Sequence, residues 1–181
     1  MKVSLHNSNV SATMLLVLLA ALGFASASVA NLPLGEEISQ DESTCPDKWV
    51  DASFVEMGCL YFNSTQALHW DEANSMCQMG SNSTLLAITS EMQMTFIQMQ
   101  LDVIADHDGV PHDWWTAGTD VGINGRWVWA TTFANVEEYV WFSGGPSPPD
   151  NYNCLALYSS SDYLGLNTMC EQGMYSICQL K

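Results

Sequence analysis

Six cysteines carry the clearest chemical signal in the chain: Cys45, Cys59, Cys77, Cys154, Cys170 and Cys178. They include no Cys-x-x-Cys pair and no His/Cys cluster, so neither zinc binding nor thiol redox chemistry is indicated. An even number of cysteines in an exported chain predicts disulfides, here three. The sequence alone leaves several pairings open.

No motif of a known enzyme class accompanies these cysteines. The chain lacks a nucleophile elbow, a His-Glu-x-x-His motif and a phosphate-binding loop. Disulfide formation by all six cysteines would also remove the thiol nucleophile. We therefore expect a protein that is not an enzyme.

Acidic and histidine side chains gather at residues 106–113, where Asp106-His107-Asp108 and His112-Asp113 resemble a set of metal ligands. Turn-forming residues lie between the two groups, at Gly109-Val110-Pro111. A solvated acidic loop between a helix and a strand is therefore the favoured interpretation. Asp120, further along, is either structural or part of an auxiliary Ca²⁺ site.

Residues 1–30 have the pattern of a secretory signal peptide. Lys2 precedes the apolar run of residues 14–22, and two small-x-small sites follow within residues 25–30. The run is too short to span a membrane comfortably, so we expect a secreted, extracellular protein without a membrane anchor. Residues 31–44 carry four acidic residues with Pro33 and Gly35 and predict a flexible acidic leader. Residues 45–181 then form one domain.

The mature chain is strongly acidic. Without Lys2, three basic residues remain against 20 acidic residues, which gives a formal net charge of −17. Such a surface repels nucleic acids and anionic membranes, so neither is expected as a partner. It suits Ca²⁺, neutral glycans or basic partners, although a solvated surface that favours solubility is the simpler explanation.

Two helices are expected to precede residue 109. The first should begin at or just before His69 and run to Met79, ending at Gly80. The second should be capped by Thr89 or Ser90. Its expected buried stripe consists of Phe96, Ile97, Leu101 and Ile104.

The aromatic stretch Trp114–Trp129 predicts a β-hairpin. Asn124-Gly125 lies between two apolar runs, and both residues tolerate the positive φ of a type I′ turn. Trp127 and Trp129 are two residues apart and should share one face of the second strand. Further strands are expected at residues 154–158 and 175–179.

Together these features resemble the C-type lectin-like domain. The resemblance covers residues 45–181 and rests on a Trp-containing strand at residues 115–118, the Trp-x-Trp strand at residues 127–129 and four framework cysteines. The sequence of residues 115–120 is similar to that of secreted invertebrate members. Residues 45–62 look like the N-terminal hairpin of long-form members. The family implies an α+β fold with two helices, small antiparallel sheets and a long loop region. It also implies the disulfides Cys45–Cys59, Cys77–Cys178 and Cys154–Cys170.

Sugar-binding members of this family hold one Ca²⁺ with side-chain carbonyls that flank a cis-proline, in a Glu-Pro-Asn or Gln-Pro-Asp triplet. An Asn-Asp pair before the third framework cysteine completes their site. Counted from Trp141, the triplet position here is Gly145-Pro146-Ser147; counted by similarity it is Pro148-Pro149-Asp150. The position of the pair is Leu166-Asn167 or, with one deletion, Asn167-Thr168.

No register supplies a complete ligand set for Ca²⁺, which requires six to eight oxygens. We therefore expect the Ca²⁺ site to be weak or lost, and no cofactor is certain. The candidate ligand-binding or Ca²⁺-binding residues are Pro149, Asp150, Asn151, Asn153 and Asn167.

Aromatic side chains offer two kinds of role. The resemblance favours a core role for Trp115, Trp127 and Trp129. Exposed stacking on sugars is expected instead from the tyrosines of the loop-rich regions, Tyr139, Tyr152 and Tyr163. Two Asn-x-Ser/Thr sequons in the mature chain predict N-glycosylation, at Asn63 and Asn82.

The predicted function is recognition of a carbohydrate or glycoprotein ligand outside the cell, as in the humoral defence lectins of innate immunity, with a degenerate Ca²⁺-dependent sugar site. The alternative is a calcium-independent domain that binds protein or contributes to an extracellular or mineralised matrix.

Overall fold

The computed structural model describes residues 45–79, 82–147 and 151–181. The predicted signal peptide (1–30) and acidic leader (31–44) lie outside the described residues. So do Gly80, the predicted end of the first helix, and the candidate site residues Pro149 and Asp150.

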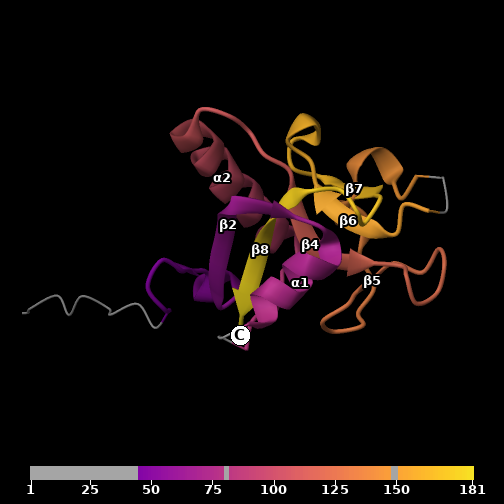
Figure 1. Ribbon diagram of the computed structural model, residues 1–181, viewed down its shortest axis with the longest axis horizontal. Coiled ribbons are helices and arrows are strands. Elements are labelled where there is room, and N and C mark those ends of the chain that lie inside the picture. Colours follow the sequence, from indigo (N-terminus) through magenta and orange to yellow (C-terminus); the bar gives the residue numbers. More distant parts are fainter. Residues whose placement is uncertain (1–44, 80–81, 148–150) are drawn as a thin grey trace, which may run out of the picture. The chain divides into compact units, whose positions relative to one another are not determined.

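One mixed β-sheet organises the described chain, with the strand order β1-β2-β8-β4-β6-β7; β3 pairs with β8, and β5 pairs with β4. Its strands are β1 (Val50–Asp51), β2 (Cys59–Leu68), β3 (Thr84–Leu85), β4 (Trp114–Thr119), β5 (Val128–Trp129), β6 (Cys154–Leu157), β7 (Gly165–Thr168) and β8 (Met174–Leu180). All pairs are antiparallel except β4 and β8, which run parallel. Figure 1 shows β8 running between β2 and β4. The predicted α+β class is confirmed, and the expected small antiparallel sheets are joined into one sheet through the parallel pair.

Helix α1 (Trp70–Gln78) begins after its N-cap residue, His69, as predicted. The backbone N–H of His69 donates to the Glu72 carboxylate at 3.0 Å, so the first helical turn is closed by its own side chain. Ala73 and Cys77 are buried on the inner face of the helix.

Helix α2 (Glu91–Asp108) begins after Ser90, whose hydroxyl accepts a hydrogen bond from the Gln93 backbone N–H at 3.3 Å. The Thr89-or-Ser90 prediction is thereby narrowed to Ser90. The helix ends at Gly109, which adopts a left-handed conformation (φ 73°) that glycine reaches without steric cost. In the described part of the chain, no helix combines the length and hydropathy that crossing a membrane requires.

Three disulfides link the pairs that the family resemblance implies. Cys45–Cys59 closes the N-terminal hairpin, Cys77–Cys178 joins α1 to β8, and Cys154–Cys170 joins β6 to the chain after β7. The second bridge spans 101 residues of sequence and holds together the two ends of the domain.

Several tryptophans are buried in the hydrophobic core. Trp114, Trp115 and Trp129 are less than 2% exposed, which confirms the core role predicted for Trp115 and Trp129. Two indole N–H groups also connect elements: Trp70 donates to the carbonyl of Thr116 on β4, and Trp115 donates to the carbonyl of Leu68 at the end of β2, each at 2.8 Å. Burial of an indole is compatible with stability when its N–H finds such a partner.

The β4–β5 hairpin differs from the predicted one. Gly118 pairs with Trp129 and Thr119 with Val128, so residues 120–127 form the connection and not a two-residue turn. Gly125 has a positive φ (77°), but Asn124 is not among the described residues with positive φ, which excludes a type I′ turn. Two successive turns replace it, closed by hydrogen bonds from Ile123 to Asp120 and from Arg126 to Ile123.

Candidate functional site

The candidate site is the loop that leaves Trp141 and returns to β6. The 3₁₀ turn η2 (Glu138–Val140) leads into it, the 3₁₀ turn η3 (Phe142–Gly144) lies within it, and its Gly145–Pro146 peptide bond is cis. Trp141 is 7% exposed and its ring meets the ring of Trp127 edge-on, with centroids 4.9 Å apart. Because both indoles are buried, the start of the loop is fixed to the core.

Asn167 on β7 fixes the far part of this loop. Its Oδ1 accepts the backbone N–H of Ser147 at 2.9 Å, and its Nδ2 donates to the Ser147 carbonyl at 2.6 Å. The same Nδ2 also donates to the carbonyl of Tyr152 at 3.2 Å. One side chain thus holds both arms of the loop. We call this set of contacts the Asn167 clamp.

The clamp occupies Asn167 Oδ1, the side-chain oxygen that a metal site at this position would need. At the described triplet position, Gly145 and Ser147 carry no side-chain carbonyl on either side of Pro146. The Asn167 carbonyl, the remaining predicted ligand on β7, is already bonded to the backbone of Ser147. The described residues therefore do not assemble the six to eight oxygens that Ca²⁺ requires.

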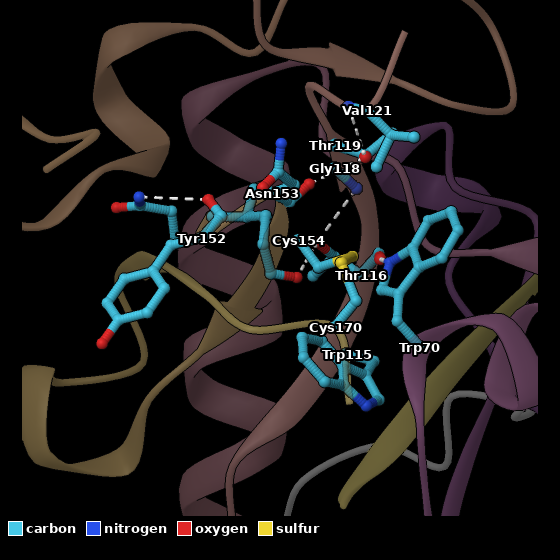
Figure 2. The surroundings of a disulfide bond; sticks show 12 residues. Trp70, Trp115, Thr116, Gly118, Thr119, Val121, Tyr152, Asn153, Cys154 and Cys170 are labelled. Atoms are coloured by element: carbon cyan, nitrogen blue, oxygen red, sulfur yellow. Dashed lines mark hydrogen bonds between the residues drawn. A yellow bond between two sulfur atoms is a disulfide. The ribbon is translucent and has the colours of Figure 1, made fainter. Parts of the chain in front are cut away.

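The other described candidate residues lie beside the Cys154–Cys170 disulfide. The backbone carbonyl of Asn153 accepts the Thr119 hydroxyl at 2.8 Å and the Asp120 N–H at 3.2 Å, which ties the loop to the end of β4 (Figure 2). In the described chain, the Asn153 side chain has no hydrogen bond, and it remains available to a ligand. Asn151 is exposed.

Asp120 is buried where β4 ends, with 5% of its surface exposed. Its Oδ2 accepts the Gly125 N–H at 2.9 Å, while Oδ1 has no partner among the described residues. The carboxylate therefore closes the loop that replaces the predicted type I′ turn, because it offers the backbone an acceptor that the simple hairpin lacks. This favours the structural interpretation of Asp120.

The cluster at residues 106–113 is only partly the predicted loop: residues 109–113 connect α2 to β4, whereas residues 106–108 are helical. Asp106, His107 and Asp108 form the last turn of α2, which continues to Gly109. Asp113 accepts two hydrogen bonds from Ser159, from its N–H at 2.8 Å and from its hydroxyl at 3.0 Å. Within the ranges that the structure describes, no group of three histidine, cysteine or acidic residues is placed to hold a metal ion.

The three tyrosines predicted for sugar stacking differ in exposure. Tyr163 is only 3% exposed and its hydroxyl lies 3.5 Å from the Leu101 carbonyl, so its prediction is wrong. Tyr139 is partly buried with its hydroxyl unpaired among the described atoms, and burial raises the pKa of this phenol, as does the nearby charge of Glu137. Tyr152 is half-buried, and its ring projects away from the disulfide (Figure 2).

A mainly apolar pocket of about 260 Å³ adjoins the β4–β5 connection. Ile123, Val128 and Phe133 contribute its apolar wall, and Arg126 lies at the same pocket. Ile123 is 59% exposed and Phe133 is 77% exposed, which is unusual for such large apolar side chains. Sequence reasoning did not identify this pocket, since its residues come together only through the wide loop between β4 and β5.

The two predicted glycosylation sites lie in different environments. Asn63 is in β2 with 5% of its surface exposed; its Nδ2 lies 3.5 Å from the Ser176 hydroxyl, and its Oδ1 accepts the Thr65 hydroxyl at 2.7 Å. Burial of this nitrogen disfavours a glycan at Asn63 in the folded sheet. Asn82 is exposed, and glycosylation there remains a prediction.

The chain is similar to known proteins in sequence and in fold. The family model described as "Lectin C-type domain" matches residues 66–180. Lithostathine-2 of Mus musculus is 24% identical over 164 residues, which cover 88% of this chain and 90% of the relative.

Two solved structures share the fold at low sequence identity. The C-type lectin domain of murine dendritic cell inhibitory receptor 2, solved in complex with an N-glycan, is 19% identical with a TM-score of 0.60, over 76% of this chain and 99% of the other. A calcium-independent type II antifreeze protein is 23% identical with a TM-score of 0.60, over 75% and 93% of the two chains. At these identities the likeness shows the fold alone.

Proposed function

The chain belongs to the C-type lectin domain family, a family of non-enzymatic binding domains, and from this premise we propose that it recognises carbohydrate or glycoprotein ligands outside the cell without a complete Ca²⁺ site. The Asn167 clamp carries this proposal. An amide that is hydrogen-bonded to Ser147 and Tyr152 shapes the loop without a metal ion.

The surface beside the clamp supplies the groups that sugar recognition uses. Tyr152 offers a half-buried ring for stacking against the apolar face of a sugar. The Asn153 amide, unpaired within the described chain, can donate to and accept from hydroxyl groups. Asn151 adds a second exposed amide at the same end of the loop. With no metal to anchor vicinal hydroxyls, we expect the affinity for a single sugar to be low.

Different relatives support the two parts of this proposal, a carbohydrate ligand and independence from calcium. A related domain was solved with an N-glycan, which is consistent with a carbohydrate ligand. A protein of the same fold is calcium-independent, which is consistent with a stable loop that lacks the metal. The signal-peptide pattern and the disulfides support an extracellular location, and the likeness of residues 115–120 to secreted invertebrate lectins supports a role in innate immune recognition.

Glycan-array binding with and without EDTA tests the proposal. We expect weak binding to a restricted set of glycans, unchanged by EDTA. The affinity should fall about two- to tenfold for Tyr152→Ala, because stacking on one ring contributes roughly 0.5–1.5 kcal/mol. The matched control is Tyr61→Ala, which removes a partly buried ring on β2, away from the loop. Binding that EDTA abolishes would contradict the proposal.

A second candidate function is binding of a protein without calcium. The 260 Å³ pocket favours it, since Ile123 and Phe133 expose apolar surface around a cavity of the size that one large side chain fills. No binding on the glycan array, together with loss of a protein partner on Phe133→Ser, would favour this candidate over the first.

An acidic surface would equally suit a mineralised matrix, which calcium phosphate adsorption can test.

A further inference from the structure

The mainly apolar pocket beside the β4–β5 connection lies on the face of β5 that is turned away from the core. Trp127 and Trp129 are buried, so the alternation of an extended chain turns Val128 to the opposite face, where it lines the pocket. Ile123 from the connection and Phe133 from the turn after β5 complete the apolar wall. The pocket is therefore built by two loops on one short strand.

Phe133 is held in this wall by a strained backbone. Its φ is 60°, a left-handed conformation that a bulky L-residue rarely adopts, and its side chain is 77% exposed. The Phe133 N–H donates to the Trp129 carbonyl at 2.8 Å, which closes the turn around it. Strained residues of this kind gather at ligand sites, where the surrounding structure fixes them in advance. Strain and exposure together favour a binding role for this ring over a packing role.

Arg126 lines the same pocket with a guanidinium that is unused. Within the described chain this group makes no hydrogen bond and no ion pair, although the chain carries 20 acidic residues. Asp120 is the one carboxylate of the β4–β5 connection, and its Oδ2 accepts the Gly125 N–H instead. The planar fork of N–H donors on Arg126 is thus free to bind a ligand, and its geometry matches the two oxygens of a carboxylate.

We propose that this pocket binds a short fatty acid, with the hydrocarbon against Ile123, Val128 and Phe133 and the carboxylate on Arg126. Aliphatic walls favour the hydrocarbon because each buried methylene group is removed from water. The cavity of about 260 Å³ lies just below the usual range for ligand pockets, roughly 300–1,000 Å³, so it suits a short body and not a long lipid chain. The proposal is independent of glycan binding, since its ligand is measured without any glycan.

The overall charge of the chain opposes this ligand, which makes a test selective. A chain with a large negative net charge attracts cations over its whole surface and repels anions. Non-specific binding of a hydrocarbon chain would therefore favour an amine head group over a carboxylate. A preference for the carboxylate must come from a local positive group, and Arg126 is the one basic residue among those that line the pocket.

Titrations of the full chain, expressed in eukaryotic cells, with hexanoate, 1-hexanol and hexylamine test the proposal. Saturation-transfer NMR on the ligands measures affinities in the expected range. We expect hexanoate to bind with a dissociation constant on the order of 1 mM, and the alcohol and the amine to bind at least about fivefold more weakly, because they lack the charge-assisted hydrogen bonds to a guanidinium. No binding of hexanoate, or equal binding of hexylamine, would overturn the proposal.

The variant Arg126→Gln tests the head-group contact. It should weaken hexanoate binding at least about fivefold and leave 1-hexanol binding unchanged, because the side chain keeps a similar length and loses its charge. Lys181→Gln is the matched control: it removes the same charge from an exposed residue that does not line this pocket, and hexanoate binding should stay unchanged. Equal losses in the two variants would assign the effect to net charge and overturn the proposal.

The variant Phe133→Gly tests the apolar wall. It removes the ring, and glycine adopts the left-handed φ of this position without steric cost, so the fold should be retained. Hexanoate and 1-hexanol should both bind at least about threefold more weakly, because less apolar surface covers the hydrocarbon. Unchanged affinities for both ligands would show that the hydrocarbon lies elsewhere and overturn the proposal. Far-ultraviolet circular dichroism confirms that each variant is folded.

Discussion

Asn167 pairs with both backbone polar groups of Ser147, accepting from its N–H at 2.9 Å and donating to its carbonyl at 2.6 Å. The side chain of Asn167 thus bonds to the backbone of Ser147 in the way that the backbone of a neighbouring strand would. Asn167→Asp should break the donor half of the clamp, because a carboxylate cannot donate to the carbonyls of Ser147 and Tyr152. We expect faster hydrogen exchange over residues 145–153 and a loss of about 1 kcal/mol in the free energy of unfolding.

The control for this prediction is Asn153→Asp, which makes the same chemical change at the residue next to the clamp's contact at Tyr152. The Asn153 side chain has no hydrogen bond within the described residues, so exchange in the loop should stay unchanged. Equal effects from the two variants would show that the added charge, and not the clamp, controls the loop.

Calcium should bind weakly, if at all. The described residues of the loop between Trp141 and β6 include no carboxylate, and those at the triplet position carry no side-chain carbonyl. Protein sites that bind Ca²⁺ with micromolar affinity rely on several carboxylates. Isothermal titration calorimetry should therefore detect no site of micromolar affinity. If a loose site appears at millimolar Ca²⁺, Asp150→Ala should abolish it and leave the melting temperature unchanged. A micromolar site would mean that other residues are the ligands.

Gly118 on β4 is required by the side chain of Leu155 on the neighbouring strand β6. A Cβ atom at position 118 would lie 2.5 Å from Leu155 Cδ2 and 2.6 Å from its Cβ. Gly118→Ala should therefore cost about 1–3 kcal/mol in the free energy of unfolding, the usual range for overpacking. Gly122→Ala is the control, because nothing lies within 4 Å of its added Cβ. Urea titration of both variants measures the difference, and equal stabilities would refute the steric argument.

Glycosylation should occur at one of the two sequons. Asn82 is exposed, while Asn63 is buried between β2 and β8. Mass spectrometry of protein from eukaryotic cells should find a glycan on Asn82. The Asn82→Gln variant should lose this glycan mass, whereas the Asn63→Gln variant should keep the same glycan mass as the wild type. A glycan on Asn63 of the folded protein would show that this part of β2 opens, or is arranged differently.

Stability should fall in alkaline solution because of buried phenols. Burial raises the pKa of Tyr163 above its ordinary value of 10.0, and the nearby charge of Asp102 adds to the effect. The stabilisation is complete below the unfolded-state pKa and is lost as pH rises through the folded-state pKa, because the unfolded chain releases the proton first. The free energy of unfolding should therefore decrease from about pH 10 upward.

Tyr163→Phe should reduce this alkaline decrease, since the variant has one fewer buried group to ionise. Denaturant titrations at several pH values above and below 10.0 measure it. Tyr152→Phe, in which the altered ring is half-buried, is the control and should follow the wild type. An unchanged pH dependence in Tyr163→Phe would assign the alkaline transition to another group.

The parts of the fold that local chemistry decides were predictable from the sequence. Ser90 and His69 begin their helices because capping depends on a few adjacent residues. The disulfide pairing was predictable only through the family resemblance, since spacing alone permits many pairings.

Errors arose where a side-chain contact outside the local motif decides the outcome. The Asn124-Gly125 signal for a tight hairpin was overruled by the Asp120 carboxylate, which binds Gly125 and widens the loop. Tyr163 follows a short turn after β6 and looks exposed in sequence, yet α2 covers it. The Asn167 clamp could not be predicted at all, because its partners Ser147 and Tyr152 become neighbours only after folding.

The place of β8 in the sheet has a consequence for biosynthesis. The strand nearest the C-terminus, Met174–Leu180, lies in the interior of the sheet and pairs with β2, β3 and β4, and Cys77 must wait for Cys178 before its disulfide can form. A nascent chain therefore holds β2 and β4 with open edges until residues 174–180 have left the ribosome, and only then can the sheet close. A chain truncated before residue 174 would therefore lack the strand that joins β2 to β4 and should aggregate rather than fold into a partly working domain.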